Sequence, residues 1–390
     1  MLAMLSRRLS LPSRSFFLFG PRGTGKTTWL RSLLPEARWF NLLLEREVVR
    51  LLRDPGLLQQ ELAAAPRGSW VVIDEIQRLP ALLDEVHDLL AGEPSRLRFA
   101  LTGSSARKLR RGDVNLLAGR AITRHLFPLI AAELDYEAGI DDLLTFGGLP
   151  IVRTETDRVT RVDLLEAYVD TYLTQEVRAE ALVRNLAGFT RFLEVAALAN
   201  GQVTSVASLA RDAAVARPTV QGHFDVLVDT LIGAWLPAWR PRAKVKEVGH
   251  SKFYFFDTGV VRALARRLRE PIDSAERGTL LETWLFHELR AHIAYAGSGG
   301  ELSHWRTPSG SEVDFVWSRG ARAVGIEVTA SPRWRSEHGR ALKELVRSGI
   351  VQRGFAVYTG DRALRDEEIP VLPWKDFLRE LTDGRIIGST

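Results

Sequence analysis

The sequence predicts an α/β protein of several domains, the first of which holds a parallel sheet covered by helices. The chain has 390 residues, which is too long for one typical domain. Short apolar runs alternate with helical patterns from residue 16 to about residue 127, as expected for parallel strands joined by crossover helices. A glycine-rich loop follows the first apolar run directly and leads into a helical pattern.

A phosphate-binding pattern lies between the predicted first strand and the predicted first helix. The stretch 16–30 reads FFLFGPRGTGKTTWL, which predicts a strand at 16–19 and a helix at 26–34. The spacing G-x-x-x-x-G-K-[ST] predicts backbone N–H groups around a phosphate chain, a lysine on the outer phosphates and a hydroxyl on Mg²⁺. We therefore expect ATP and Mg²⁺ as cofactors. The residues expected to bind the nucleotide are Gly20, Pro21, Arg22, Gly23, Thr24, Gly25, Lys26, Thr27 and Thr28.

Four further strands are expected at 38–43, 69–75, 96–105 and 120–127. The second of these reads SWVVIDE and ends in two carboxylates. Asp74 would hold Mg²⁺ together with Thr27, and Glu75 would orient and deprotonate the attacking water. The next strand ends LTGSS, so Thr102 and Ser104 would lie at the same edge of the sheet. There a hydroxyl could sense the γ-phosphate, or it could simply cap a helix.

The remaining chain divides by its patterns into three further segments. Residues 136–200 read as amphipathic helices, which predicts a small helical domain or lid after a core at 1–135. Residues 201–272 combine a sequence pattern typical of a helix-turn-helix, at 206–232, with a basic, aromatic-rich stretch. Residues 273–390 return to mixed helix and strand.

The basic stretch WLPAWRPRAKVKEVGHSKFYFF resembles the wing hairpin of winged-helix domains, which contacts nucleic-acid phosphates. An ordinary basic surface hairpin is the alternative, and the helix pair before it could equally pack against protein. The residues expected to contact DNA are Arg240, Arg242, Lys244, Lys246 and Lys252.

Composition excludes several classes of protein. The net charge of +5 permits binding to a polyanion without proving it. The absence of cysteine excludes disulfides and thiolate zinc sites, and the 8 histidines show no ligand-like pairing. No signal-peptide core and no apolar stretch of membrane-spanning length occur, so we expect a cytoplasmic protein without a membrane partner.

Nine motifs together resemble one family. GPRGTGKTT, VVIDEIQRLP, LTGSSARKL and LAGRAITRHLFPL, followed by FGGLP, KFYFFDTGVVRAL, LLETWLFHEL, HWRTPSGSEVDFVW and IEVTAS, resemble the AAA+ ATPases of bacteria and archaea that carry a C-terminal endonuclease-like domain. The resemblance implies a P-loop AAA+ core with a helical lid, a winged-helix-like domain and a restriction-endonuclease-like α/β domain. It also implies that Ser104 or Thr102 lies at the sensor position.

The same resemblance implies an arginine that acts on a neighbouring subunit. Arg120 lies in the region where such ATPases place this residue, and Arg107, Arg110 and Arg111 compete for the role. An arginine acting in trans would place the nucleotide between subunits. We therefore expect a homo-oligomer, in the form of a hexameric ring, with a filament as the alternative.

In the last segment, Glu282, Asp314 and Glu327 resemble the metal-holding carboxylates of the restriction-endonuclease fold. Asp314 and Glu327 would meet across a hairpin that turns near 319–322. The motif normally ends E-x-K, but Thr329 occupies the lysine position, with Arg306 and Arg333 as the nearby basic residues. We therefore expect a vestigial metal site and a domain that does not cut DNA efficiently.

These observations favour an AAA+ ATPase that couples ATP hydrolysis to remodelling of DNA, by translocation, helicase action or branch migration. Two alternatives stay open. One is a nucleotide-dependent regulatory or defence switch that binds protein partners. The other is an ATP-gated DNA nuclease, which the threonine at position 329 disfavours.

Overall fold

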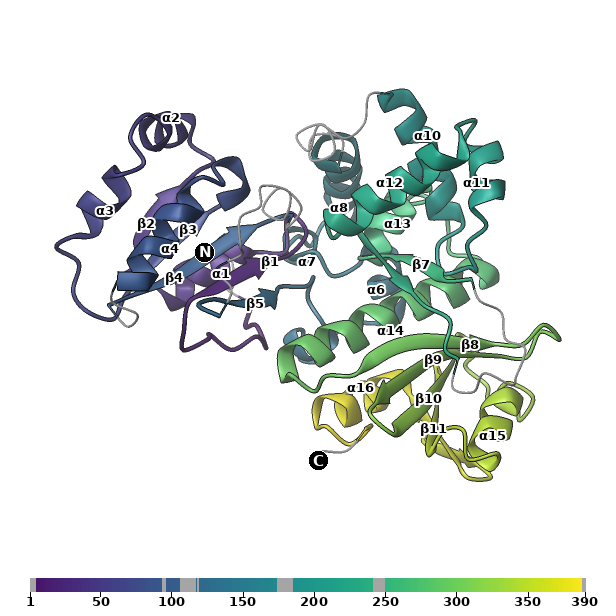
Figure 1. Ribbon diagram of the computed structural model, residues 1–390. Helices are drawn as coiled ribbons and strands as arrows, with labels where there is room; N and C mark the ends of the chain where they lie inside the picture. The colour runs from purple at the N-terminus through teal and green to yellow at the C-terminus, as the bar shows by residue number, and fades with distance from the viewer. Residues whose placement is uncertain are drawn as a thin grey trace. The chain divides into compact units, whose positions relative to one another are not determined.

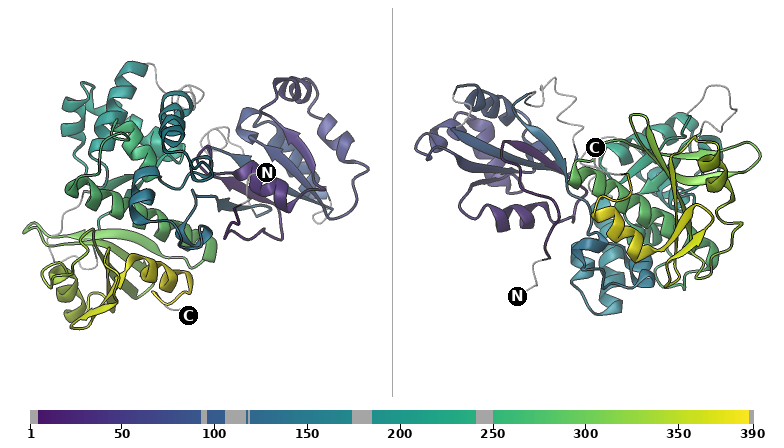
Figure 2. Two further views of the ribbon diagram at one scale, coloured as in Figure 1. Left: turned by 180° about the vertical axis from the view of Figure 1, so that it is seen from behind. Right: turned by 90° about the horizontal axis from the view of Figure 1, so that it is seen from below.

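The computed structural model describes residues 5–92, 96–105, 117, 119–173, 185–240 and 250–387. The chain forms two compact units (Figures 1 and 2). The N-terminal unit comprises Leu9–Phe127 and Asp229–Leu231, and the C-terminal unit comprises Met1–Arg8, Pro128–Val228 and Ile232–Thr390. None of the described helices is both long enough and apolar enough to span a bilayer.

The N-terminal unit contains the predicted parallel sheet. Its five strands run in the order β2-β3-β4-β1-β5, and every neighbouring pair is parallel. The strands are β1 Phe16–Phe19, β2 Arg38–Asn41, β3 Ser69–Asp74, β4 Leu97–Gly103 and β5 Ile122–His125. The prediction of five parallel strands is therefore confirmed. Since all five run in the same direction, their carboxyl ends meet at one edge.

Helices cover both faces of this sheet because its strands are apolar on both sides. The described helices of this unit are α1 Lys26–Leu33, α2 Glu45–Arg53, α3 Leu57–Leu62, the short 3₁₀ helix η1 Ile76–Arg78 and α4 Leu82–Gly92. Phe16 packs edge-to-face against Trp29 of α1. Phe17 points to the opposite face and belongs to the same apolar cluster as Val86 of α4.

The C-terminal unit begins with helices. After the short helix η2 Ala131–Glu133, the described helices are α6 Ile140–Phe146, α7 Pro150–Arg153, α8 Arg158–Ala167, the π-helix Tyr168–Leu173 and α10 Leu186–Leu198. A helix pair and a hairpin follow, namely α11 Val206–Asp212, α12 Arg217–Asp229, β6 Gly233–Leu236 and β7 Lys252–Phe255, and then α13 Thr258–Leu264. β6 and β7 are antiparallel.

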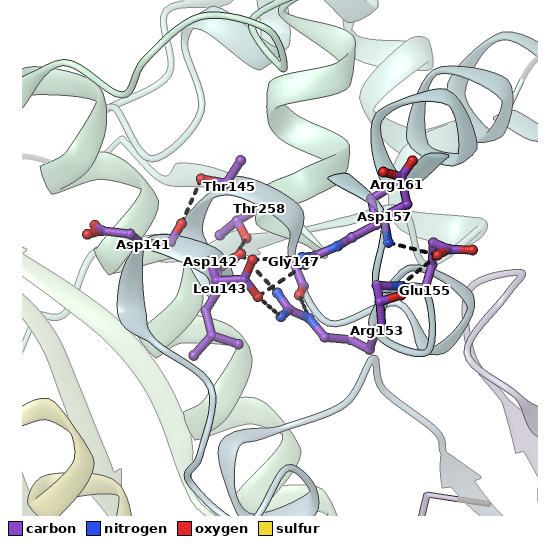
Figure 3. A network of polar contacts seen from close by, with 11 residues as sticks. Asp141, Asp142, Leu143, Thr145, Gly147, Arg153, Glu155, Asp157, Arg161 and Thr258 are labelled. Carbon is purple, nitrogen blue, oxygen red and sulfur yellow. Dashed lines mark hydrogen bonds and ion pairs between the residues drawn. The ribbon is translucent and has the colours of Figure 1, made fainter. Parts of the chain in front are cut away.

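A partly buried polar network holds α6, α7 and α8 together (Figure 3). Arg153 of α7 and Arg161 of α8 both pair with Asp142 of α6, and the Arg161 Nη1 to Asp142 Oδ1 distance is 2.8 Å. Asp257, which caps the first turn of α13, accepts a hydrogen bond from the Gly148 backbone at 2.6 Å. The FGGLP motif therefore connects the helices through backbone and carboxylate contacts.

The unit ends in a six-stranded mixed sheet with strand order β12-β13-β11-β10-β9-β8. The strands are β8 Glu301–Arg306, β9 Glu312–Arg319, β10 Arg322–Thr329, β11 Arg353–Tyr358, β12 Leu364–Asp366 and β13 Ile369–Pro373. Helix α14 Ser274–Ala296 and helix α16 Trp374–Thr382 share an apolar cluster with Phe315 and Ile326. Helix α15 Arg340–Arg347 packs against Val316 in a separate cluster. The predicted boundaries after 135, 200 and 272 remain predictions.

Candidate functional site

The glycine-rich loop joins β1 to α1 at the carboxyl edge of the N-terminal sheet. Gly23 and Gly25 have φ of 82° and 87°, a backbone conformation that costs little only for glycine. Gly20 lies so close to Leu126 that an added Cβ would be 2.3 Å from the Leu126 carbonyl oxygen. Gly25 precedes the first turn of α1, which begins at Lys26. The loop therefore ends at a helix N-terminus, where partial positive charge favours anions.

Lys26 is held by the loop itself. Its side chain is buried, and Nζ donates to the carbonyl oxygens of Gly20 at 2.8 Å and Pro21 at 3.2 Å. Both of these partners are neutral carbonyl groups. This arrangement is suited to the outer phosphates of a nucleotide.

Hydroxyl groups hold the carboxylate that ends β3. Thr27 Oγ1 donates to Asp74 Oδ2 at 2.9 Å, and Thr102 Oγ1 lies 2.5 Å from Asp74 Oδ1. The Glu75 backbone N–H donates to the same Thr102 oxygen at 3.0 Å. β3 and β4 are neighbours in the sheet, which brings Asp74 and Thr102 together. Thr27 and Asp74 fit Mg²⁺, because this ion takes a hydroxyl and one carboxylate while keeping several waters.

Sequence reasoning overlooked Gln77, which lies two residues beyond Glu75. The Gln77 side chain is buried, and its Nε2 donates to Glu75 Oε2 and, at 3.1 Å, to Ser104 Oγ. Glu75 has φ of 63°, in the left-handed region that only a few per cent of non-glycine residues adopt. The amide therefore connects the predicted base to the predicted sensor hydroxyl. The sequence signal was the glutamine in the text DEIQ directly after the carboxylates.

Of the four arginines considered for action in trans, the structure describes one. Arg120 is exposed, and its guanidinium contacts the imidazole of His87 on α4. Arg107, Arg110 and Arg111 lie outside the described residues. The trans-acting arginine stays a prediction.

The predicted DNA-binding residues separate into three groups. Arg240 is exposed, as a phosphate contact requires. Arg242, Lys244 and Lys246 lie outside the described residues. Lys252 corrects the prediction, because it is only 4% exposed and its Nζ is surrounded by carboxylates. A buried, ion-paired ammonium is not available to a DNA phosphate.

The three predicted carboxylates of the last segment converge within the C-terminal unit. β9 and β10 form the predicted antiparallel hairpin, with Arg319 paired to Arg322 beside the turn, and Asp314 and Glu327 project from these strands. Glu282 comes from α14. The unpredicted member is Lys252, which enters from β7. Arg306, one of the two nearby basic residues, lies 3.4 Å from Glu312.

Family comparisons divide the chain into three segments. Residues 12–134 match the family described as an AAA domain. Residues 137–270 and 277–377 match two families described as domains of unknown function, DUF8612 and DUF4143. Residues 12–134 are therefore similar to AAA domains, and the endonuclease-like and winged-helix details stay predictions.

Two curated relatives and two solved structures are similar to the chain. The relatives are uncharacterized proteins of Mycobacterium tuberculosis and Mycobacterium bovis, each 28% identical over 86% of this chain and 76% of the relative. The ORC2 protein of Aeropyrum pernix in its ADP form covers 66% of this chain and 88% of its own, with 12% identity and a TM-score of 0.32. A RuvB variant of Thermotoga maritima covers 57% and 82%, with 19% identity and a TM-score of 0.28. Scores this low support no function for this chain.

Proposed function

We propose that this protein is an ATP hydrolase that couples ATP binding and hydrolysis to DNA binding and remodelling. The observation that carries the hydrolase half is the hydrogen-bonded group of Thr27, Asp74, Thr102 and Glu75 beside the glycine-rich loop. This group combines a hydroxyl and a carboxylate for Mg²⁺ with a second carboxylate at the same sheet edge. An AAA-type domain containing these residues is a nucleotide-dependent enzyme.

Each residue of the group has a separate role in the reaction. The N–H groups before α1 bind the phosphate chain, and Lys26 binds the outer phosphates. Thr27 and Asp74 would hold Mg²⁺, which would supply positive charge to neutralise the phosphates. Thr102 orients Asp74 and fixes the backbone of Glu75 through its single hydroxyl. Glu75 then accepts the proton of the attacking water.

We extend the proposal to DNA on the basis of charge. Exposed Arg240 begins the basic stretch, which continues through Arg242, Lys244 and Lys246. Lysines and arginines that neutralise phosphates release counterions, so such binding weakens steeply with salt. We further propose that Arg120 completes the site of a neighbouring subunit in a homo-oligomeric, hexameric ring.

The test is the ATPase rate of the full chain with duplex, single-stranded and branched DNA, compared with the rate without DNA. We expect at least one form of DNA to stimulate turnover, and Glu75→Gln to abolish turnover in every condition. Neutralising Arg240, Arg242, Lys244 and Lys246 together should weaken DNA binding and flatten the log–log salt slope by up to about four. An ATPase rate that DNA does not change, together with an absence of DNA binding, would favour the protein-partner switch instead.

The ring is tested by mixing two inactive variants. Arg120→Ala chains lack the trans-acting group, and Glu75→Gln chains lack the base, so mixed interfaces contain some complete sites. We expect the mixture to recover turnover and the parent activity per chain to rise with concentration. Full activity in a monomer would contradict the ring.

A further inference from the structure

The carboxylate cluster of the C-terminal unit contains its own cation. Lys252 Nζ lies 2.6 Å from Glu312 Oε1, 3.4 Å from Glu282 Oε2 and 3.9 Å from Asp314 Oδ1. Its side chain is 5% exposed, so solvent screens these contacts weakly. Glu282 and Asp314 are two of the three carboxylates that the endonuclease-like motif would use to hold a metal ion.

We propose that the Lys252 ammonium takes the place of a divalent cation in this cluster, so that Glu282, Asp314 and Glu327 do not form a metal site in the natural protein. A metal bridging Glu282 and Asp314 would need carboxylate oxygens at about 2.0 to 2.6 Å. The ammonium already lies against oxygens of both residues. Two cations confined to this volume would repel each other strongly in a weakly solvated site.

Two oxygens of the cluster accept hydrogen bonds from protein donors, whereas Glu327 Oε2 is buried and has no hydrogen-bond partner among the described residues. Asp314 Oδ2 accepts a hydrogen bond from the Val328 backbone at 2.8 Å. Glu282 Oε2, the atom that faces Lys252, also accepts from the Tyr254 hydroxyl at 3.0 Å. Among the described residues, no group of three or more histidine, cysteine, aspartate or glutamate side chains is arranged to hold a metal ion. The donors therefore do not fit the metal that the motif implies.

Burial and neighbouring charges raise the pKa values of several groups in the cluster. Burial raises the pKa of Glu327 well above its usual range, and the neighbouring Asp314 raises it further. Burial also raises the pKa of Asp314, with Glu282 adding to the effect. Burial alone would lower the pKa of Lys252, but the adjacent Glu282, Asp314 and Glu312 carboxylates raise it above its ordinary value. These directions favour the charged form of the lysine and the neutral form of Asp314 and Glu327.

The ion pairs of Lys252 connect different elements of the C-terminal unit. The residue belongs to β7, whereas its partners come from α14 and β9, so the ion pairs tie the β6–β7 hairpin to the C-terminal sheet. The inference concerns a site separate from the ATPase site and does not rest on the proposed function.

The experiment measures Mn²⁺ binding by calorimetry to the nucleotide-free full chain. Every protein is compared with a matched copy that carries Asp314→Asn, which identifies binding at this cluster and separates it from the nucleotide site. We expect the parent and its Asp314→Asn copy to show the same Mn²⁺ binding. Lys252→Met should gain such a site, with an apparent affinity about tenfold or more above the parent.

A second variant keeps the test decisive if Lys252→Met does not fold. The double variant Lys252→Met with Glu312→Gln removes the cation and its nearest anion together, so the net charge of the cluster is unchanged. Its three motif carboxylates remain, and it should also gain Mn²⁺ binding. If the parent binds Mn²⁺ and Asp314→Asn removes this binding, the proposal is overturned. The absence of a gain in every folded lysine variant would overturn it too.

Discussion

A buried lysine and carboxylates occur in both units of this protein, but their partners differ. In the N-terminal unit, Lys26 bonds to backbone carbonyls and Asp74 bonds to the hydroxyls of Thr27 and Thr102. In the C-terminal unit, Lys252 contacts Glu282 and Glu312 directly. These hydrogen bonds of the first site join charged groups to neutral ones, whereas the contacts of the second site join groups of opposite charge.

The difference shows that residue types alone do not decide whether a site can take a charged ligand. Neutral donors orient a carboxylate without cancelling its charge, so a cation can still bind it. A buried ion pair instead uses the attraction of its charges to offset their loss of hydration, and removing one partner leaves the other unpaired. We therefore expect the N-terminal site to matter for turnover and the C-terminal cluster to matter for stability.

The largest expected effect is on ATP hydrolysis. Glu75→Gln should lower kcat about a thousandfold, since it removes the proton acceptor, while ATP binding is kept. Lys26→Ala should instead lose tight nucleotide binding. Asp314→Asn, which changes the other site in the same isosteric way, should leave kcat unchanged. Steady-state ATPase rates and nucleotide titration provide the comparison, and a parent-like rate for Glu75→Gln in preparations free of other ATPases would contradict the assignment of the base.

The next effect compares the two lysines by the same substitution. Lys252→Met should lower the free energy of unfolding by about 3 kcal/mol, because buried carboxylates lose their cation. Lys26→Met should lower it by about 1 kcal/mol, because hydrogen bonds to neutral carbonyl groups are lost. Hydrogen exchange under increasing urea, read at β7 and at β1, reports each unit separately. Equal losses in the two units would remove the distinction between the sites.

The two sites also differ in how far the sequence could predict them. The five parallel strands followed from apolar periodicity, and parallel strands place Asp74 and Thr102 at one edge whatever the details of packing. Lys252 could not be placed in this way. Its position depends on how β7 packs against α14, which no local pattern encodes. The sequence contained a partial signal, because the residues FYF that follow the lysine are apolar. In the structure all four residues of this strand are buried.

Other parts of the site depend on side-chain contacts that spacing does not specify. Gln77 was overlooked because a glutamine after a strand normally faces solvent, whereas here the 3₁₀ helix η1 turns it inward. The convergence of Asp314 and Glu327 was predictable because a hairpin brings facing positions together. The charge state of that cluster was not predictable, since it depends on the lysine.

A smaller kinetic effect is expected at Gln77. Its amide donates to both Glu75 and Ser104, so Gln77→Ala should leave the base less well positioned and lower kcat about tenfold. The KM for ATP should stay unchanged, because Gln77 contacts no residue of the glycine-rich loop in the hydrogen bonds described here. Gln59→Ala is the matched control, since the Gln59 side chain donates to Glu85 at an exposed position. Identical rates for both variants would contradict a positioning role.

The smallest effect is a difference in pH dependence between the two sites. Burial raises the pKa of Glu327 in the folded chain. Above the ordinary glutamate pKa of about 4.3, the unfolded chain therefore holds fewer protons at this residue than the folded chain, and stability falls as pH rises. Glu327→Gln carries no titrating proton and resembles the protonated acid, so it should flatten this fall.

At pH 8 the Glu327→Gln chain should accordingly be more stable than the parent by about 1 kcal/mol. Asp74→Asn should have the opposite sign, because the amide disturbs the hydrogen bonds from Thr27 and Thr102. Urea unfolding between pH 5 and 8, followed by hydrogen exchange in each unit, measures both variants. A Glu327→Gln chain that is less stable than the parent at pH 8 would mean that the folded cluster needs this carboxylate in its charged form, as a metal site does, and the contrast between the two units would fail.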